Sequence, residues 1–154
     1  MGEKVTSDTF YPDSVPGITN GQRLALMRNA INAHTDYTKE AVQGQGIDRH
    51  LLGLKMIAVE SGINLPDLFM DGTYAYSLHF KLSTSQVPFK DDSYLVYGPS
   101  VPDGYAICYN PLPQKLLFGI TSCNSNPNTN SGHFAAYLQR SLDDMRLLTT
   151  SSKL

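Results

Sequence analysis

The stretch Leu82-Ser83-Thr84-Ser85-Gln86-Val87-Pro88 follows shortly after the chain changes from helical to strand-like patterning. Upstream, apolar residues recur at helical spacing, whereas from Tyr74 onward short aromatic or β-branched runs alternate with turn residues. Three consecutive hydroxyl side chains after such a run can donate hydrogen bonds to a ligand oxygen or to a developing oxyanion. This stretch is therefore the first candidate for a ligand-binding site.

Two helices are expected before this stretch. Thr19 or Asn20 can cap the first, which carries apolar residues at roughly helical spacing. The second begins near Ile47 and ends at Ser61-Gly62, and a short helical turn is expected at 67–70.

The part that follows is typical of short strands closed by a helix. Turns are expected at Asp103-Gly104 and at 110–113. Strands are expected at 74–82, 94–97, 105–109 and 116–121, and the final helix at 131–148. Helices, then strands, then a helix predict an α/β fold, with a mixed sheet covered by helices in one domain over 19–148. Residues 1–18 are expected to be irregular or disordered, and 149–154 to form a flexible tail.

Composition places the chain among globular proteins. Its 154 residues are 41% hydrophobic, which suffices for one domain with a hydrophobic core. A net charge of −2 gives no reason to expect nucleic acid or an anionic membrane as partner. No apolar run approaches the length of a membrane span, so no membrane-spanning segment is expected.

Common catalytic and metal motifs are absent from the sequence. There is no Gly-rich phosphate loop, no Gly-x-Ser-x-Gly elbow and no His-Glu-x-x-His zinc signature. The four histidines are scattered, so a structural or surface role is expected for each, and no metal site is expected. Cys108 and Cys123 are expected to be thiols, with a disulfide as the alternative.

The tripeptide Ser152-Lys153-Leu154 matches a peroxisomal address that an import receptor reads at a C-terminus. The peroxisome is therefore the expected location and the import receptor an expected partner. A mitochondrial or cytoplasmic location stays open as an alternative.

The string over residues 82–88 resembles the signature of the choline/carnitine acyltransferase family. Further motifs follow the family's order and spacing over roughly 35–148. They are Asp48-Arg49-His50-Leu51-Leu52-Gly53-Leu54, Phe69-Met70-Asp71, Gly98-Pro99, Val101-Pro102-Asp103-Gly104-Tyr105, Cys108-Tyr109-Asn110-Pro111 and Asp144-Met145-Arg146. The resemblance implies part of the C-terminal half of a CoA-dependent acyltransferase fold of the chloramphenicol acetyltransferase type. In that fold the active site lies in a tunnel between two similar halves.

The resemblance also implies direct acyl transfer between acyl-CoA and carnitine, the two expected small-molecule partners. A histidine base removes the proton of the carnitine hydroxyl, which attacks the thioester, so no metal and no cofactor besides the substrate are expected. In the family that histidine lies in the preceding half, and no position here matches it. The chain is therefore expected to need an N-terminal half as partner and to be inactive alone. A non-catalytic isoform or remnant that binds coenzyme A or carnitine weakly is the alternative.

Two residues take expected carnitine-binding roles from the resemblance. Arg49 matches an arginine that faces the carnitine carboxylate, for which a planar guanidinium is suited, and it opposes the alternative of a choline-specific member. Tyr97 falls where an aromatic residue holds the trimethylammonium group by cation–π attraction.

The resemblance assigns the reacting groups to the neighbourhood of the hydroxyl triplet. Ser85 matches a serine beside the carnitine hydroxyl and is expected to bind carnitine and to stabilise the transition state, whereas Ser83 and Thr84 are expected to shape the loop. Gln86 matches a contact to coenzyme A. Leu95 takes the place of a bulky residue that closes the acyl pocket, which implies transfer of acetyl or propionyl and opposes a medium-chain member.

Overall fold

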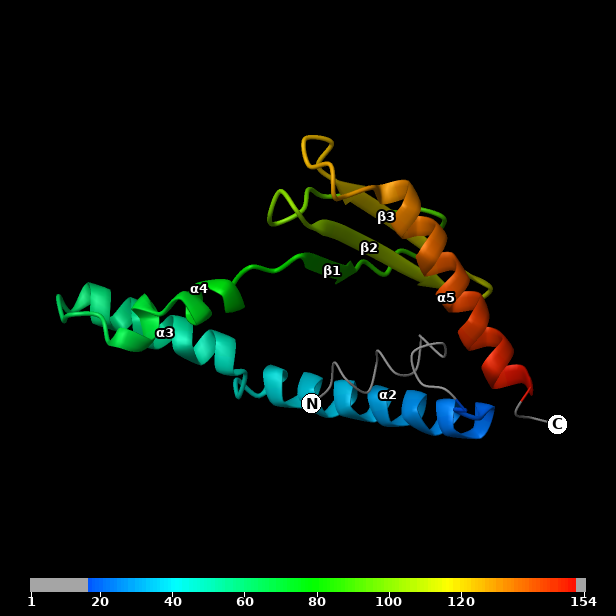
Figure 1. Ribbon diagram of the computed structural model, residues 1–154, viewed down its shortest axis with the longest axis horizontal. Coiled ribbons are helices and arrows are strands. Elements are labelled where there is room, and N and C mark those ends of the chain that lie inside the picture. Colours follow the sequence, from blue (N-terminus) through cyan, green and yellow to red (C-terminus); the bar gives the residue numbers. More distant parts are fainter. Residues whose placement is uncertain (1–16, 152–154) are drawn as a thin grey trace. The chain divides into compact units, whose positions relative to one another are not determined.

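The structure, a computed structural model, describes residues 17–151 of an α/β protein (Figure 1). The chain divides into two compact units, one formed by the part up to Pro66 together with the part from Arg140, the other by 67–139. The mixed sheet and its helices confirm the predicted fold class. The tripeptide Ser152-Lys153-Leu154 and most of the segment 1–18 lie outside the described residues.

Two long helices belong to the first unit and confirm the predicted pair. α2 spans Asn20–Val42 and begins at the N-cap Thr19. Thr19 Oγ1 accepts the amide of Gln22 at 3.3 Å, and Gln22 Oε1 accepts the amide of Thr19 at 2.8 Å, so each residue caps the other. α3 spans Ile47–Glu60, and just beyond it Gly62 takes φ +65°, a left-handed conformation that ends a helix.

The last helix, α5, spans Ser131–Ser151 and is longer than the predicted 131–148. Thr149 donates its hydroxyl to the carbonyl of Met145 at 3.0 Å, one turn back along the helix. The segment expected as a tail over 149–154 is therefore helical in its first three residues, 149–151.

The strand predicted over 74–82 is wrong except at its last residue, because 74–77 are helical, 78–81 carry neither helix nor strand, and only Leu82 belongs to a strand. The observed order is η2 (Asp67–Met70), α4 (Gly72–Ser77) and β1 (Leu82–Gln86). Asp71 caps α4, because its carboxylate accepts the amide of Thr73 at 2.6 Å, and this contact lowers the pKa of Asp71. Tyr74 is buried and meets Phe69 edge to face, with ring centroids 5.2 Å apart. The aromatic run thus packs as a short helix, because a cap and an aromatic contact outweigh strand propensity.

The second unit is built on a three-stranded sheet in the order β1-β2-β3. β2 (Tyr105–Leu112) pairs in parallel with β1 and antiparallel with β3 (Lys115–Ser122), so the sheet is mixed. The strands predicted at 105–109 and 116–121 are confirmed, each with longer ends. Four of the buried residues lie in β2: Ala106, Ile107, Cys108 and Asn110. The middle strand therefore forms the centre of this unit.

β2 also runs through most of the turn predicted at 110–113. The amide of Tyr105 faces β1 and donates to Lys81 O at 2.7 Å. Because successive amides alternate along a strand, the nitrogen of Pro111 faces the same side. The pairing of β1 with β2 ends at Tyr109, so Pro111 interrupts no hydrogen bond of that ladder.

The strand predicted at 94–97 is also wrong. Residues 93–99 are described and carry neither helix nor strand. Side chains of the sheet bind this backbone instead: the Thr121 hydroxyl donates to Tyr97 O, and Asn110 Nδ2 donates to Ser93 O at 2.9 Å. Donors from side chains replace the amides of a neighbouring strand, which is why the aromatic pattern does not form a ladder.

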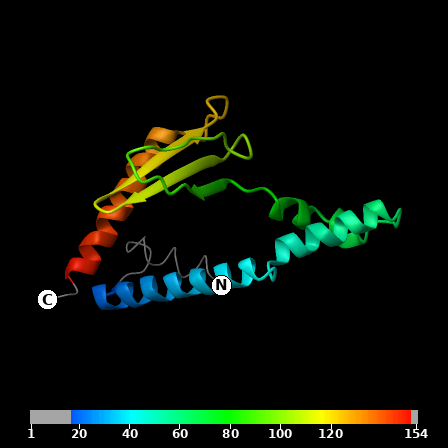
Figure 2. The same cartoon turned by 180° about the vertical axis from the view of Figure 1, so that it is seen from behind.

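The beginning of α5 covers one face of the sheet, as Figures 1 and 2 show from opposite sides. The rings of Tyr105 and Phe134 lie 4.7 Å apart, and the Tyr105 hydroxyl accepts the amide of Asn130 at 2.9 Å. The start of the helix is thereby tied to the start of β2.

Candidate active site

Ser85 lies inside β1 rather than in a loop after a strand. It stands opposite Cys108 of β2 in the parallel pairing. Side chains alternate along a strand, so Ser83 and Ser85 share one face of β1, and Thr84 and Gln86 share the other. Within the described part of the chain, the Ser85 hydroxyl is exposed and makes no hydrogen bond. It is therefore available to donate to a ligand oxygen.

Tyr97 reaches the same face of β1. Its hydroxyl lies 3.3 Å from Ser83 Oγ and donates to Ile107 O at 3.5 Å. Because Ser83 and Ser85 point the same way, the sheet brings two of the expected carnitine-binding residues, Ser85 and Tyr97, to one surface. Ser83 links them. In the sequence, its place two residues before Ser85 could have indicated that Ser83, and not Thr84, shares the face of Ser85.

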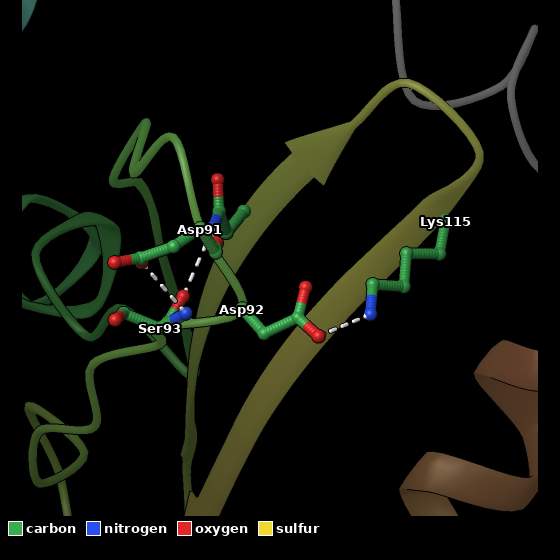
Figure 3. Close-up of polar contacts among 5 residues, drawn as sticks. Asp91, Asp92, Ser93 and Lys115 are labelled. Atoms are coloured by element: carbon green, nitrogen blue, oxygen red, sulfur yellow. Dashed lines mark hydrogen bonds and ion pairs between the residues drawn. The ribbon is translucent and has the colours of Figure 1, made fainter.

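The loop before Tyr97 is anchored by Asn110, a polar residue with no exposed surface. Asn110 Nδ2 donates to the carbonyls of Asp91 and Ser93, at 3.1 and 2.9 Å. The Asp91 carboxylate in turn accepts the Ser93 amide at 3.1 Å, and the hydrogen bonds from Ser93 lower the pKa of Asp91 (Figure 3). The buried Asn110 side chain of β2 therefore fixes the backbone at 91–93, from which the chain continues to Leu95. The sequence offered only one sign of this, a lone polar residue next to a buried apolar run.

Leu95 lies where this segment passes close to Gly119 of β3. A Cβ on Gly119 would lie 2.7 Å from Leu95 O and 2.6 Å from Val96 Cγ1, so the missing side chain of Gly119 permits the approach. The Leu95 side chain is 45% exposed. The structure thus fixes the backbone at Leu95 against the sheet and leaves part of its side chain at the surface.

Gln86 is the last residue of β1 and lies on the face opposite to Ser85. Its side-chain oxygen accepts the Tyr109 hydroxyl at 3.4 Å, a long hydrogen bond at an exposed position. Just beyond, the amide of Val87 donates to Tyr109 O at 3.0 Å and ends the pairing of β1 with β2.

Arg49 belongs to the first unit, in the first turn of α3. Its Nε lies 3.1 Å from a carboxylate oxygen of the neighbouring Asp48, and its side chain is 78% exposed. Asp48 is favourable at this end of the helix, because it faces the positive end of the helix dipole. An exposed guanidinium beside a helix N-terminus suits an anionic ligand group such as a carboxylate.

An open hollow of about 510 Å³ lies beside the turn between β2 and β3. Its lining residues are Lys90, Asp92, Leu112, Pro113, Gln114 and Lys115. Asp92 and Lys115 form an ion pair across it at 2.6 Å (Figure 3). None of the predicted site residues lines this hollow, so it is separate from the surface that carries Ser85.

Both cysteines are free thiols, Cys108 buried and Cys123 partly buried, so the disulfide alternative does not hold. Within residues 17–151, no three His, Cys, Asp or Glu side chains gather as they would around a metal ion. No helix in that part of the chain combines the length and apolar character that a membrane crossing requires.

Comparison with known proteins places this geometry in a family. The family model described as choline/carnitine O-acyltransferase matches residues 6–140, so it begins upstream of the resemblance predicted over roughly 35–148 and ends before it does. Carnitine O-acetyltransferase from Rattus norvegicus is 49% identical over 133 residues, which cover 86% of this chain and 21% of the relative. The enzyme of that name from Homo sapiens is 48% identical over 134 residues, covering 87% of this chain and 21% of the relative. Choline O-acetyltransferase from Homo sapiens is 45% identical over 142 residues, covering 92% of this chain and 19% of the relative.

The chain thus spans about a fifth of the length of the curated relatives it matches. The match to the family model covers most of the chain and includes the hydroxyl triplet, the loop through Tyr97 and the first turn of α3. This chain belongs to the choline/carnitine O-acyltransferase family.

Proposed function

We propose that this chain supplies the Ser85 region of a carnitine O-acetyltransferase, which moves a short acyl group reversibly between coenzyme A and carnitine. The observation that carries the proposal is the shared face of β1: the free Ser85 hydroxyl lies on the same face as Ser83, whose hydroxyl contacts that of Tyr97. A hydroxyl donor beside an aromatic ring suits a substrate that holds a reacting alcohol and a quaternary ammonium a few bonds apart.

In this proposal each residue acts on a different part of the substrates. Ser85 donates a hydrogen bond that stabilises the charge developing in the transition state. Tyr97 presents its ring to the trimethylammonium group, and Arg49 binds the carboxylate of carnitine. Gln86 contacts coenzyme A from the opposite face of β1, and Leu95 limits the length of the acyl chain.

The proposal assigns the general base to a histidine of another segment, because no histidine of this chain matches the one that the family uses. Acyl transfer to an alcohol needs a base within hydrogen-bond reach of the hydroxyl. We therefore propose that the 154-residue chain does not catalyse the transfer by itself.

A hybrid enzyme tests this division of labour. The segment of the rat carnitine O-acetyltransferase that aligns with this chain is replaced by residues 19–148, and release of free coenzyme A thiol is measured with acetyl-CoA and carnitine. We expect the hybrid to be active, the 154-residue chain alone to be inactive, and Ser85→Ala to lower kcat of the hybrid by about tenfold to a thousandfold. Turnover by the chain alone would overturn the assignment of the base, and an inactive but folded hybrid would favour the non-catalytic alternative.

The choice between carnitine and choline has its own test, since choline O-acetyltransferases also match this chain. In the hybrid, Arg49→Asn removes the cation that would face the carnitine carboxylate. We expect KM for carnitine to rise by about tenfold or more with little change for choline, because a charge-assisted pair is lost only with carnitine. A hybrid that prefers choline before the substitution would refute the carnitine assignment.

Acyl-chain length is tested at Leu95. Replacing Leu95 with Gly in the hybrid removes the side chain that is proposed to close the acyl pocket. The ratio of octanoyl to acetyl transfer is expected to rise. An unchanged ratio would remove Leu95 from the site.

We also propose that Ser152-Lys153-Leu154 directs the protein to peroxisomes when it stands at the C-terminus. A fluorescent protein fused ahead of residues 131–154 is expected to gather in peroxisomes, and the same fusion lacking Leu154 to remain diffuse. A diffuse signal from both fusions would refute the address.

A further inference from the structure

Three charged or titratable side chains meet where β1 and β2 begin. Asp103 Oδ1 lies 2.7 Å from His79 Nε2, and Asp103 Oδ2 lies 3.1 Å from Lys81 Nζ. His79 and Lys81 precede β1, whereas Asp103 precedes β2. The Asp103 carboxylate, just before β2, therefore binds two residues that lie just before β1, one with each of its oxygens. We call His79, Lys81 and Asp103 the entry clip.

The backbone is equally close at this point. The amide of Tyr105 donates to Lys81 O at 2.7 Å, the first contact between the two strands. A Cβ on Gly104 would lie only 2.7 Å from Lys81 O and 2.9 Å from Val101 Cγ2. Glycine is needed at 104 because the two backbones approach too closely for any side chain. The entry clip thus sits on a tight backbone junction.

The position of Ser85 depends on how β1 pairs with β2. β1 has five residues and pairs with β2 from Leu82 opposite Tyr105 to Gln86 opposite Tyr109. A slip of one residue would turn Ser85 to the other face, and a slip of two would move it by about 7 Å along the sheet. Among the described strands, β1 has a neighbour only on the β2 side, so contacts at its ends add to its five paired residues in holding the register.

The entry clip is exposed, so its effect on the position of β1 can be distinguished from its small effect on the free energy of unfolding. The side chains of Lys81, His79 and Asp103 are 58%, 37% and 31% exposed. Exposed ion pairs contribute little to the free energy of unfolding, because solvent screens them. A small free energy can still favour one register over another, because the Asp103 carboxylate contacts both His79 and Lys81. The hydrogen bond from Lys81 and then that from His79 also lower the pKa of Asp103, which favours the ionised form.

We propose that Asp103 is a positioning residue for Ser85: by holding His79 and Lys81, it fixes the register in which β1 pairs with β2. This inference rests on the proposed function, in which the Ser85 hydroxyl stabilises the transition state. Asp103 itself touches no substrate in this account. It acts through the backbone of β1.

The hybrid enzyme tests the inference, with kcat, both KM values and the thermal midpoint as readouts. Asp103→Asn is expected to lower kcat by about tenfold or more while both KM values stay within about threefold, because displacement of the acting group affects the transition state most. Asp103→Glu, which keeps the carboxylate, is expected to recover part of the loss. Asp92→Asn is the matched control, since it removes another exposed carboxylate–lysine contact, that with Lys115, and should leave kcat unchanged. A fall of equal size in the control would overturn the proposal.

A double-mutant cycle distinguishes this inference from the proposed function. If Asp103 acts through Ser85, Asp103→Asn has no further effect on kcat once Ser85 is Ala. Independent effects that multiply would refute the positioning role and leave the role of Ser85 intact. A Ser85→Ala variant with unchanged kcat would instead refute the proposed role of Ser85 and the inference with it.

Lys81→Met provides a second variant that keeps the His79 contact. Because the Lys81 side chain is more than half exposed, we expect it to fold even if Asp103→Asn does not. Its expected loss of kcat is smaller and must also vanish in the Ser85→Ala background. A loss that persists there would overturn the inference.

Discussion

Asn110 shows at the scale of one residue how a buried polar group organises the candidate site. It is fully buried in β2, yet its amide nitrogen binds two carbonyls of the loop at 91–93. Its side-chain oxygen has no hydrogen-bond partner among the described residues. A buried amide is costly unless it is bonded, so its two donated hydrogen bonds must offset the burial.

Replacing Asn110 with Ala is expected to lower the free energy of unfolding by about 1–3 kcal/mol, because the carbonyls of Asp91 and Ser93 lose a hydrogen-bond donor. Urea denaturation followed by circular dichroism measures the change, and hydrogen exchange should become faster in residues 93–97. Asn124→Ala is the control, since that side chain is exposed and should change neither quantity. Equal effects of the two substitutions would show that Asn110 does not anchor the loop.

Asp103 makes the stability depend on pH in a defined direction. Lys81 and His79 hold its pKa below the usual value of 3.8. A carboxylate whose pKa is lower in the folded state stabilises the fold above pH 3.8, and this contribution is lost as the pH falls through the lowered pKa. The difference in thermal midpoint between the chain and its Asp103→Asn variant should therefore shrink as the pH falls below 3.8.

The control for this prediction is Lys81→Met, which removes the largest cause of the lowered pKa. It should weaken the same acid dependence without abolishing it, because the contact with His79 remains. A difference that grows on acidification would contradict the assigned direction.

At the scale of elements, the entrance of the sheet depends on the absence of a side chain at 104. The Cβ of an alanine there would lie 2.7 Å from the carbonyl oxygen of Lys81, a backbone atom that cannot rotate away. β1 and β2 must then separate at their first contact. The free energy of unfolding should fall by about 1–3 kcal/mol, as for other overpacked sites.

Gly98→Ala is the matched control for Gly104→Ala, because a Cβ there meets no atom within 4 Å. The measurement is the thermal midpoint together with hydrogen exchange at the Tyr105 amide, which donates to Lys81 O. Faster exchange is expected only in Gly104→Ala. If both variants behave alike, the close approach at residue 104 does not hold the two strands together.

At the scale of the whole chain, many large apolar side chains are exposed. In α3, Leu52, Met56 and Val59 are 42%, 45% and 55% exposed and follow a spacing that places them on one face of the helix. Exposed apolar stripes of this kind are typical of surfaces that contact other protein.

The isolated 154-residue chain is therefore expected to self-associate at micromolar concentration, because α3 exposes an apolar stripe. Sedimentation velocity measures the association, which should weaken when Met56 and Val59 are both replaced with Gln. Val42→Gln is the control, since Val42 is 83% exposed but lies in α2, away from this stripe in the sequence. A chain that remains monomeric would contradict the prediction.

The sequence by itself determined the elements whose signals are local. The cap at Thr19, the stop at Gly62 and the strands around 105–109 and 116–121 were readable, because capping and periodicity act between neighbouring residues. The hydroxyl triplet at 83–85 was equally readable as a candidate site, since its residues are contiguous.

Only the tertiary structure decided what depends on residues far apart in the chain. Tyr97 meets Ser83 across 14 positions, and His79 meets Asp103 across 24, so no local period encodes either contact. The error at 94–97 has the same origin, because side-chain donors from the sheet bind that segment. The error at 74–77 is local instead, since the cap at Asp71 and the contact between Phe69 and Tyr74 outweighed strand propensity. The sequence thus marks Ser85 as a candidate site residue. The face of the sheet on which it lies, and its register, follow from the pairing of β1 with β2, which joins distant parts of the chain.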